Sequence, residues 1–483
     1  MTNLRARLAE LDVEIVEQER ILYQLKQNRI ALQRELNATV FPVATLPLEI
    51  VAEIFLHYTP HFHKPYAPVF YPSAPSVAIT GVCRAWRDIA LATPSLWSTL
   101  DVDFDLIPPH VVSVPGLVEG FIYRWLDRTG TCPLSLVFDA PARGHGSGRL
   151  MRYQEPFPLS RLRSVIHRYS DQVHSLEVDI CGRDIRALGL DWAEFPLLRR
   201  ATLFCDHNRD STLSLPGCVF GNAPRIHHLT LRSSGIPTFP LPWPRLTEFE
   251  GPISDLQLFV LAPNLTRVTC SHAAGDIESA TVISHPNLVS FTGAHSDMIR
   301  YLTLPALQYL GLYPTTNSLV PFLKRSSPPL LSLSVPGYSF AEWYPSMHLI
   351  GRTLQILTIY HPSADIMSHI CRLHTPFHAL PNLRSLTLSR VAGGVDLSFF
   401  VRFLYSRLDK PLHTFRLTWE SSPFLDGKYR TNPDDERTGD TISGHLAALS
   451  RVGMNIYLGT NEKNYASPNV LCIPKHLHAT DAF

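Results

Sequence analysis

The residues with the clearest capacity for chemistry are a glycine-rich run and several clusters of histidine, cysteine and aspartate. The run GHGSG, residues 144–148, has the small residues of a phosphate-binding loop. Such a loop also needs a lysine and a following helix, and the sequence supplies neither. We therefore interpret this run as an ordinary connecting loop.

An aspartate run and two histidine-rich segments are the candidates for a metal site. Asp101, Asp103 and Asp105 alternate with apolar residues, which is typical of the exposed side of a strand. The histidine segments match no closed four-ligand zinc site; they contain His57, His61 and His63, and His369, Cys371, His374 and His378. The GxSxG, HExxH and kinase signatures are also missing. We therefore expect no catalytic residues, no metal and no cofactor, and an enzyme with a hidden site in the repeats further along the chain is the third hypothesis.

Composition indicates a folded protein without a strong electrostatic partner. The 483 residues are 45% hydrophobic and 18% charged, and 43 basic against 42 acidic residues give a net charge of +1. This balance argues against nucleic acid or an anionic membrane as partner. The sequence contains no apolar run of about 18 residues, so no membrane span is expected. Eight scattered cysteines without a CxxC pair favour reduced thiols, hence a cytoplasmic or nuclear protein.

The elements that would position any site begin with a helix expected over residues 1–40. Apolar residues recur every seven positions in two series through residue 36, broken by Gln18 and Arg29; the series are Met1, Leu8, Ile15, Leu22 and Leu36, and Leu4, Leu11, Leu25 and Leu32. Such a repeat predicts a coiled-coil helix. Self-association, pairing with a partner helix and folding back onto the rest of the chain all stay open.

A second helical region is expected over residues 45–100. Its motifs are LPLEIVAEIF (46–55), VCRAWRDIA (82–90) and TPSLW (93–97), where Thr93 is expected to cap a short helix opened by Pro94. Five prolines between residues 60 and 75 predict a loop.

These motifs together resemble the F-box of a large group of fungal F-box proteins, which also carry a preceding coiled-coil helix and a leucine-rich-repeat-like C-terminal region. The resemblance implies a three-helix module that binds the Skp-family adaptor and, through it, a cullin ubiquitin ligase. The adaptor-binding positions it implies are Leu46, Pro47, Leu48, Ile50, Ile54, Val82 and Trp86. The insertion at 60–75 departs from the compact pattern and leaves the placement of the second helix open. An ordinary helical cap on the C-terminal region is the alternative.

The rest of the chain repeats one motif, LxxΦxΦ (Φ, apolar), usually after a proline. Eleven copies run from VHSLEV (173–178) to LHTFRL (412–417), with starts 19 to 29 residues apart, as in leucine-rich repeats. LDVDF (100–104), LSLVF (134–138) and MNIYL (454–458) are further candidate strands.

We therefore predict an α/β solenoid, a degenerate leucine-rich-repeat sheet of parallel strands over residues 101–458, because stacked repeats bury an apolar face that one repeat cannot. Residues 421–440 are expected to be a loop, and residues 459–483 a C-terminal tail. A generic α/β domain is the alternative.

Residues two, four and six after the first apolar residue of each copy should point to the open face of the sheet. Arginine and aromatic side chains there are candidates for holding a protein client; they are Arg200, Phe204, His228, Arg232, Arg267, Tyr309, Tyr313 and Tyr360. A solvated polar sheet face is the alternative reading of each. The leading hypothesis is a substrate adaptor of a ubiquitin ligase, and the second is a non-ligase scaffold assembled through residues 1–36.

Overall fold

The computed structural model describes residues 2–40, 46–58, 75–104, 107, 111, 114–139, 159–180, 188–205, 217–233, 240–253, 255–273, 281–294, 296–313, 318–371, 380–391, 397–409, 411–419 and 436–459. The GHGSG run, Asp105, His61, His63, His374, His378 and residues 460–483 lie outside these ranges. The chain divides into two compact units, Met1–Arg161 and Leu162–Phe483. Each unit is described separately.

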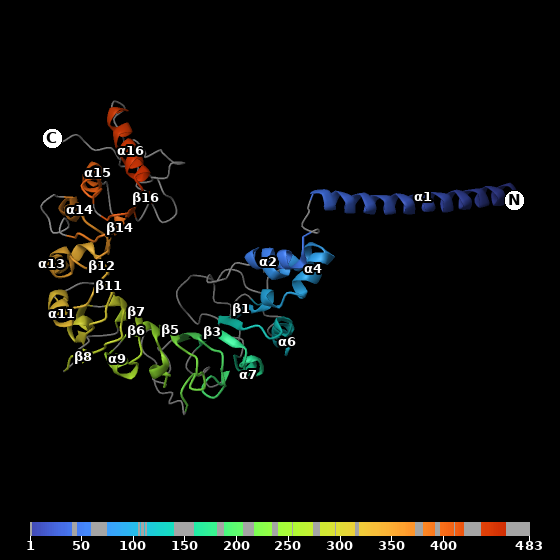
Figure 1. Cartoon of the computed structure of the whole chain (residues 1–483). Coiled ribbons are helices and arrows are strands. Elements are labelled where there is room, and N and C mark those ends of the chain that lie inside the picture. Colours follow the sequence, from blue (N-terminus) through green and yellow to red (C-terminus); the bar gives the residue numbers. More distant parts are fainter. Residues whose placement is uncertain are drawn as a thin grey trace, which may run out of the picture. The chain divides into compact units, whose positions relative to one another are not determined.

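The first unit begins with a single long helix, α1 (Thr2–Val40). A group of short helices follows: α2 (Leu48–Tyr58), α3 (Pro75–Val82), α4 (Arg84–Leu91) and a 3₁₀ turn, η2 (Pro94–Trp97). The unit continues through β1 (Thr99–Asp103), α6 (Leu117–Leu126), η4 (Asp127–Thr129) and β2 (Leu134–Asp139) (Figure 1). The expected strands LDVDF and LSLVF thus form β1 and β2, which pair in parallel.

The second unit contains one strand for each of the eleven LxxΦxΦ copies. These are β3 (Val173–Ile180), β4 (Arg200–Cys205), β5 (His228–Ser233), β6 (Glu248–Ile253), β7 (Arg267–Ala273), β9 (Ser290–Ala294), β11 (Tyr309–Leu312), β12 (Ser332–Pro336), β13 (Ile356–Tyr360), β14 (Ser385–Val391) and β15 (Thr414–Trp419). MNIYL supplies one more strand, β16 (Asn455–Gly459). A separate two-stranded pair joins β8 (Ile283–Ser284) and β10 (Leu302–Thr303).

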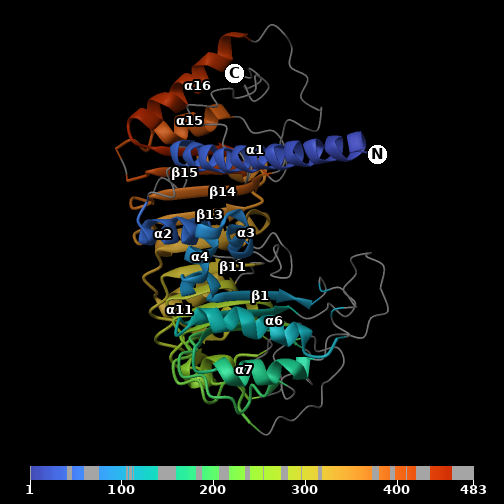
Figure 2. The same ribbon diagram turned by 90° about the vertical axis from the view of Figure 1, so that its right-hand side faces the viewer.

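In the described part of the second unit, the strands from β3 to β16, apart from β8 and β10, belong to one sheet and follow one another in sequence order. Neighbouring strands of the second unit run parallel, as Figure 2 shows for β11, β13, β14 and β15. The prediction of an α/β arrangement built on stacked parallel strands is therefore confirmed.

Short helices lie between the strands along the chain. They are η5 (Leu159–Leu162), α7 (Arg163–Tyr169), η6 (Trp243–Arg245), α9 (Leu258–Leu261), α10 (Ser296–Arg300), α11 (Leu319–Ser326), η7 (Gly337–Ser339), α12 (Phe340–Trp343), η8 (Tyr344–Ser346), α13 (Met347–Ile350), α14 (Ala364–Cys371), α15 (Leu397–Tyr405) and α16 (Glu436–Arg451). Within the second unit, the strands line the inner side of a curve and α9, α11 and α13 lie outside it (Figure 1). The α16 helix corrects the expected loop at 421–440, because it starts at Glu436.

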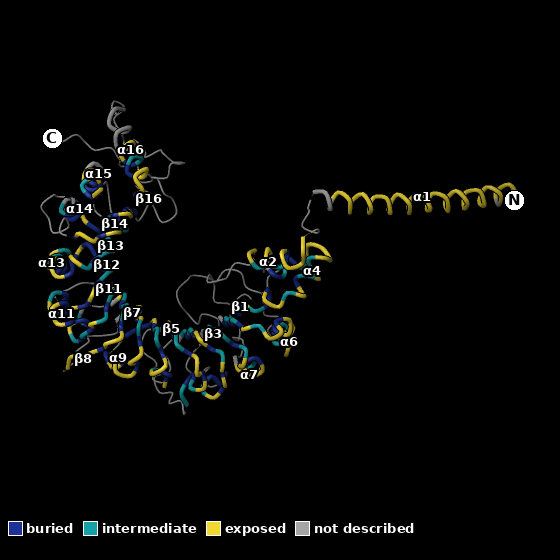
Figure 3. The backbone as a smooth tube through the Cα atoms, in the orientation of Figure 1, coloured by how far each residue is buried: buried dark blue, intermediate teal, exposed yellow. Residues whose placement is uncertain are grey.

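The core of the second unit is a row of apolar side chains that crosses the sheet. Each strand contributes the fourth residue of its LxxΦxΦ copy, and register places these residues side by side, as in Leu333, Leu357 and Leu386. From Leu229 to Phe415 the members of this row are between 0% and 2% exposed (dark blue in Figure 3). Burial of each such side chain contributes about 1.5–3 kcal/mol, which explains why the repeats stack.

Asparagine side chains tie consecutive repeats together at the turns before the strands. The Nδ2 atoms of Asn264, Asn287 and Asn382 donate to carbonyl oxygens of the preceding repeat, at 2.7, 3.1 and 2.6 Å respectively. Each bond satisfies a turn carbonyl that no strand reaches. The PNL tripeptide that carries all three was visible in the sequence.

Among the described residues, the search for a helix of sufficient length and apolar character to cross a bilayer finds none.

Candidate partner-binding surfaces

The first candidate surface is the α2 apolar face, defined as Leu46, Pro47, Leu48, Ile50 and Ile54. Leu48, Ile50 and Ile54 are 65%, 48% and 44% exposed. Ile50 and Ile54 are four residues apart, so they lie on one side of the helix. Leucine and isoleucine side chains are usually buried in folded proteins. Their exposure here indicates a surface suited to an apolar partner.

The start of α2 is shaped by Pro47. Its carbonyl oxygen accepts bonds from the backbone N–H groups of Ile50 and Val51, at 3.0 and 3.1 Å. Proline suits a first turn because the N–H it lacks would have no partner inside the helix. Glu49 places negative charge in the same turn, which complements the helix dipole.

The other face of α2 is held by a small aromatic core. Val51 and Phe55 are buried, and the Phe55 ring lies 5.0 Å from the Trp86 ring, centroid to centroid. Trp97 is buried as well, and its Nε1 donates to the Ala90 carbonyl oxygen at 2.8 Å. Because α4 and η2 fix this core, the α2 apolar face sits on a rigid support.

Two predicted adaptor contacts lie outside the α2 apolar face. They are Val82 and Trp86, and their surroundings differ. Trp86 is half-buried against Phe55, so it belongs partly to the core. Val82 ends α3 and is exposed. Cys83 follows and caps α4, its Sγ accepting from the Trp86 N–H at 3.5 Å.

The expected cap at Thr93 is not formed. The 3₁₀ turn at Pro94–Trp97 exists, but no side chain caps it. The Thr93 hydroxyl instead donates to the Ile89 carbonyl oxygen at 2.7 Å, because that acceptor at the end of α4 lies one helical turn back.

The second candidate is the open sheet face, defined as the side chains of strands β3–β16 that alternate with the buried row. Sheet register aligns Arg200, His228, Glu248 and Arg267 on consecutive strands. Tyr309 occupies the same row, beyond Ser290 of β9. Four of the predicted client residues therefore lie in one line across the sheet.

A second line of the open sheet face lies four residues further along each strand. Phe204 and Arg232 are neighbours in it, and Tyr360 occupies the corresponding position on β13. Tyr313 follows the end of β11 and is exposed. Phe204 and Arg232 are therefore the members of this line that register places side by side, while Tyr313 and Tyr360 lie beyond two register shifts in the sheet.

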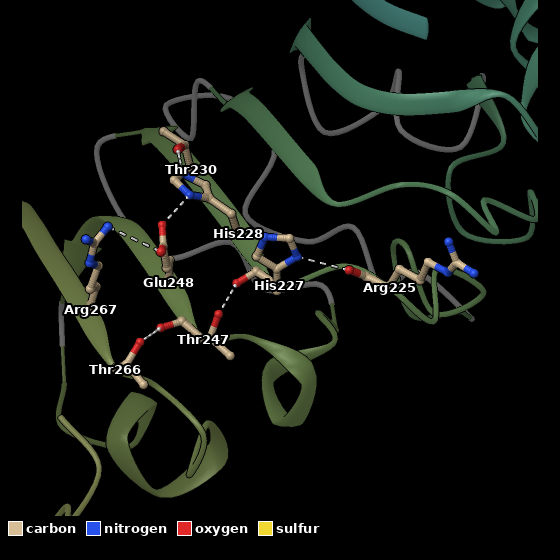
Figure 4. A network of polar contacts seen from close by, with 8 residues as sticks. All are labelled: Arg225, His227, His228, Thr230, Thr247, Glu248, Thr266 and Arg267. Carbon is tan, nitrogen blue, oxygen red and sulfur yellow. Dashed lines mark hydrogen bonds and ion pairs between the residues drawn. The ribbon is translucent and has the colours of Figure 1, made fainter. Parts of the chain in front are cut away.

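Polar contacts organise the first line around His228 (Figure 4). Its Nδ1 lies 2.9 Å from Glu248 Oε2, and its Nε2 lies 3.1 Å from Thr230 Oγ1. With the proton on Nδ1 donated to the carboxylate, the neutral ring accepts from the threonine hydroxyl. Arg267 Nη1 reaches the other carboxylate oxygen, Glu248 Oε1, at 3.4 Å. Glu248 therefore joins two candidate residues.

An arginine stacked on an aromatic ring organises the second line. The Arg232 guanidinium carbon lies 4.8 Å from the Phe204 ring centroid, and its Nη1 lies 3.8 Å from Glu177 Oε1. The guanidinium thus lies near both the Phe204 ring and the Glu177 carboxylate. An arginine held in this way is pre-organised for a partner carboxylate or carbonyl.

A tyrosine pair lies just beyond the ends of β11 and β12. The rings of Tyr313 and Tyr338 meet edge to face, with centroids 6.1 Å apart. Partial burial of the phenol, together with the hydrogen bond with Tyr313, raises the pKa of Tyr338 to about 12. Tyr338 was missed in the sequence because it lies in η7, beyond the strand whose alternation was used.

Metal ligands do not gather in the described part of the chain. Among those residues, no group of three or more histidine, cysteine, aspartate or glutamate side chains is placed to hold an ion. His369 instead lies beside the rings of Phe340 and Tyr344.

Comparison with known proteins adds no family name to these surfaces. No protein-family model matches the chain, and no curated protein matches it.

Proposed function

We propose that this chain is the substrate-recognition adaptor of a Skp–cullin–F-box ubiquitin ligase in the cytoplasm or nucleus. Residues 45–100 act as the F-box and bind the Skp-family adaptor, and the sheet acts as a leucine-rich-repeat-like surface that binds a protein client. The ligase machinery carries out ubiquitin transfer for degradation, so the chain itself is not an enzyme and needs no catalytic residue or cofactor.

The observation that carries the proposal is the exposed α2 apolar face on a rigid core. Ile50 and Ile54 are exposed while Val51 and Phe55, from the same helix, are buried. A helical segment that served only as a cap would turn its apolar residues inward. Exposed apolar residues on an ordered helix are instead the anchors that a helix partner buries.

The open sheet face supports the client-binding part of the proposal. It combines an arginine stacked on phenylalanine, a histidine–carboxylate pair and several tyrosines. Arginine and tyrosine are the residues that dominate binding energy at protein interfaces. The regular strand spacing also offers an extended surface, which suits a polypeptide better than a small molecule.

The adaptor-binding part is tested by capture of purified Skp-family adaptor on the full chain. Ile50→Asp and Ile54→Asp place a charge in the α2 apolar face and should each weaken capture at least tenfold, because a buried unpaired charge is costly. Leu261→Asp is the matched control: Leu261 is an exposed apolar residue of α9, in the second unit, and its change should leave capture unchanged. Both α2 variants capturing adaptor as well as the wild-type chain would refute the assignment.

The alternative is a scaffold that assembles through α1 and joins no ligase. The exposed apolar series of α1 favours it, because that series needs a partner helix of some kind. The same experiment separates the two functions. A wild-type chain that captures no Skp-family adaptor, while still self-associating, would leave the scaffold as the function.

A further inference from the structure

The α1 helix carries its apolar series on an exposed surface. Every described side chain of α1 is exposed. The eight leucine and isoleucine residues of the series, from Leu4 to Leu36, are between 51% and 74% exposed. The ion pair between Glu17 and Arg20 (2.7 Å) lies on the opposite side of the helix. The series is therefore the side that a partner would cover.

The charges beside the series discriminate between the two ways of pairing α1 with a second copy. In a parallel pair, the residue that immediately precedes a member of the series Met1, Leu8, Ile15, Leu22 and Leu36 faces the partner residue five places later in the sequence. Arg7 then faces Asp12, which is favourable, but Glu14 faces Glu19, which is not. In addition, Arg29 interrupts the series and would face Arg29 of the other copy inside the seam.

An antiparallel pair removes most of these conflicts. Aligning the copies so that facing positions add up to 40 places Leu8 opposite Leu32, Ile15 opposite Leu25 and Leu4 opposite Leu36. The two interruptions then separate, because Arg29 faces Leu11 and Gln18 faces Leu22. The long arginine stem can lie along a leucine while its charge reaches water.

The residues that flank the seam meet two positions out of step with it, so their numbers add up to 42 on one side and 38 on the other. Their charges also become complementary in this alignment. Arg7 of each copy faces Glu35 of the other, and Asp12 faces Lys26, so each favourable contact occurs twice. A single unfavourable contact remains, between the two copies of Glu19 at the centre. Ile21 meets Ile21 there and extends the apolar seam. Shifting the antiparallel alignment by one heptad in either direction instead opposes like charges, either Asp12 with Glu19 or Glu14 with Glu35.

We infer that α1 pairs with α1 of a second copy of this chain in an antiparallel coiled coil, with Arg7 of each copy opposite Glu35 of the other. The partner is the same chain because one sequence supplies both members of each charge pair. A helix of 39 residues is roughly 58 Å long, so the two copies continue from opposite ends of the coiled coil. This inference does not depend on ligase function.

The test is a set of charge swaps in the full chain, with the dimer dissociation constant measured by sedimentation equilibrium. Arg7→Glu and Glu35→Arg should each weaken the dimer roughly tenfold, because two attractive contacts become repulsive. The double variant Arg7→Glu/Glu35→Arg should return to the wild-type value. Arg34→Glu is the matched control, because Arg34 has the same charge as Arg7 but lies on the side of α1 away from the apolar series. Its change should have no effect.

Three results would overturn the inference. Rescue of Arg7→Glu by Asp12→Arg rather than by Glu35→Arg would indicate parallel helices. A dimer that persists in Leu25→Asp would have its interface elsewhere. A wild-type chain that stays monomeric throughout the micromolar range would show that α1 serves another partner. Capture of Skp-family adaptor is measured separately, so failure here leaves the adaptor proposal to its own test.

Discussion

The Trp86 ring packs on the Phe55 ring with centroids 5.0 Å apart and planes inclined at 55°. This contact joins the first motif of the helical region to the second, across the proline-rich insertion at 60–75. It fixes which side of α2 faces inward. The exposure of Ile50 and Ile54 is a direct consequence.

Phe55→Ala should therefore destabilise the helical region by about 3–5 kcal/mol, because it leaves a cavity under α2. Ile54→Ala, one residue away and exposed, should stay within about 0.5 kcal/mol. Amide hydrogen exchange of residues 48–58 measures both. Equal protection in the two variants would show that Phe55 is not part of a packed core.

Left-handed backbone positions in the sheet give a paired prediction. Gly293 (φ 69°) and Arg390 (φ 56°) both lie where strand register shifts, between β9 and β11 and between β14 and β15. Gly293→Ala should cost about 1–3 kcal/mol, since the added Cβ would meet the Cys270 carbonyl oxygen. Arg390→Gly should gain about 0.5–1 kcal/mol, because glycine adopts this conformation without strain.

Chemical denaturation of the two variants checks these signs. The midpoint should fall for Gly293→Ala and rise for Arg390→Gly. A loss of stability in Arg390→Gly would mean that the arginine side chain outweighs the strain of its backbone.

The pH dependence of stability should include a contribution from His174. Burial is the largest of the causes that lower the pKa of His174 from its ordinary 6.5. The nearby charges of Arg199, Arg200 and His227 are smaller causes in the same direction. Between the lowered value and 6.5 the unfolded chain binds more protons than the folded chain, so stability falls as the pH drops below about 6.5. Above pH 6.5 this contribution is fully present.

His174→Gln should accordingly lose less stability than the wild-type chain between pH 7.5 and pH 5. Urea midpoints at the two pH values provide the comparison. An unchanged or larger drop in the variant would show that His174 is not a source of acid sensitivity.

Client binding gives a prediction that needs no client name. Tyr309 and Tyr360 of the open sheet face are 41% and 38% exposed, and Tyr405 on α15 is 37% exposed. Proximity labelling from the wild-type chain should yield a set of proteins that shrinks in Tyr309→Ala/Tyr360→Ala, because truncated aromatic anchors weaken an interface. Tyr405→Ala, which changes an equally exposed tyrosine on a helix, should preserve the set. Loss with Tyr405→Ala alone would place the client on the helical side.

The strands were predictable because their signal is local and repeated. Each LxxΦxΦ copy carries its own alternation, so even MNIYL, after a long polar stretch, was found and forms β16. The long α1 helix was predictable for a similar reason, since an unbroken heptad pattern without proline or glycine leaves few alternatives.

Other features depend on contacts between repeats and left weak local signals. Gly293 and Arg390 share a backbone conformation although their residue types suggest nothing in common. The start of α16 at Glu436 was missed because its first residues are polar and follow a polar segment. Tyr338 meets Tyr313 through η7, which directly follows β12. The PNL turns, by contrast, were a sequence signal that went unused.

We propose that the α2 apolar face binds a Skp-family adaptor, and amide hydrogen exchange of the full chain with and without that adaptor checks this claim. We predict slower exchange in residues 46–58 and in the segment around Val82–Trp86 when adaptor is added, with strands β3–β16 unchanged. Unchanged exchange in residues 46–58 at saturating adaptor, or protection confined to the strands, would contradict the claim.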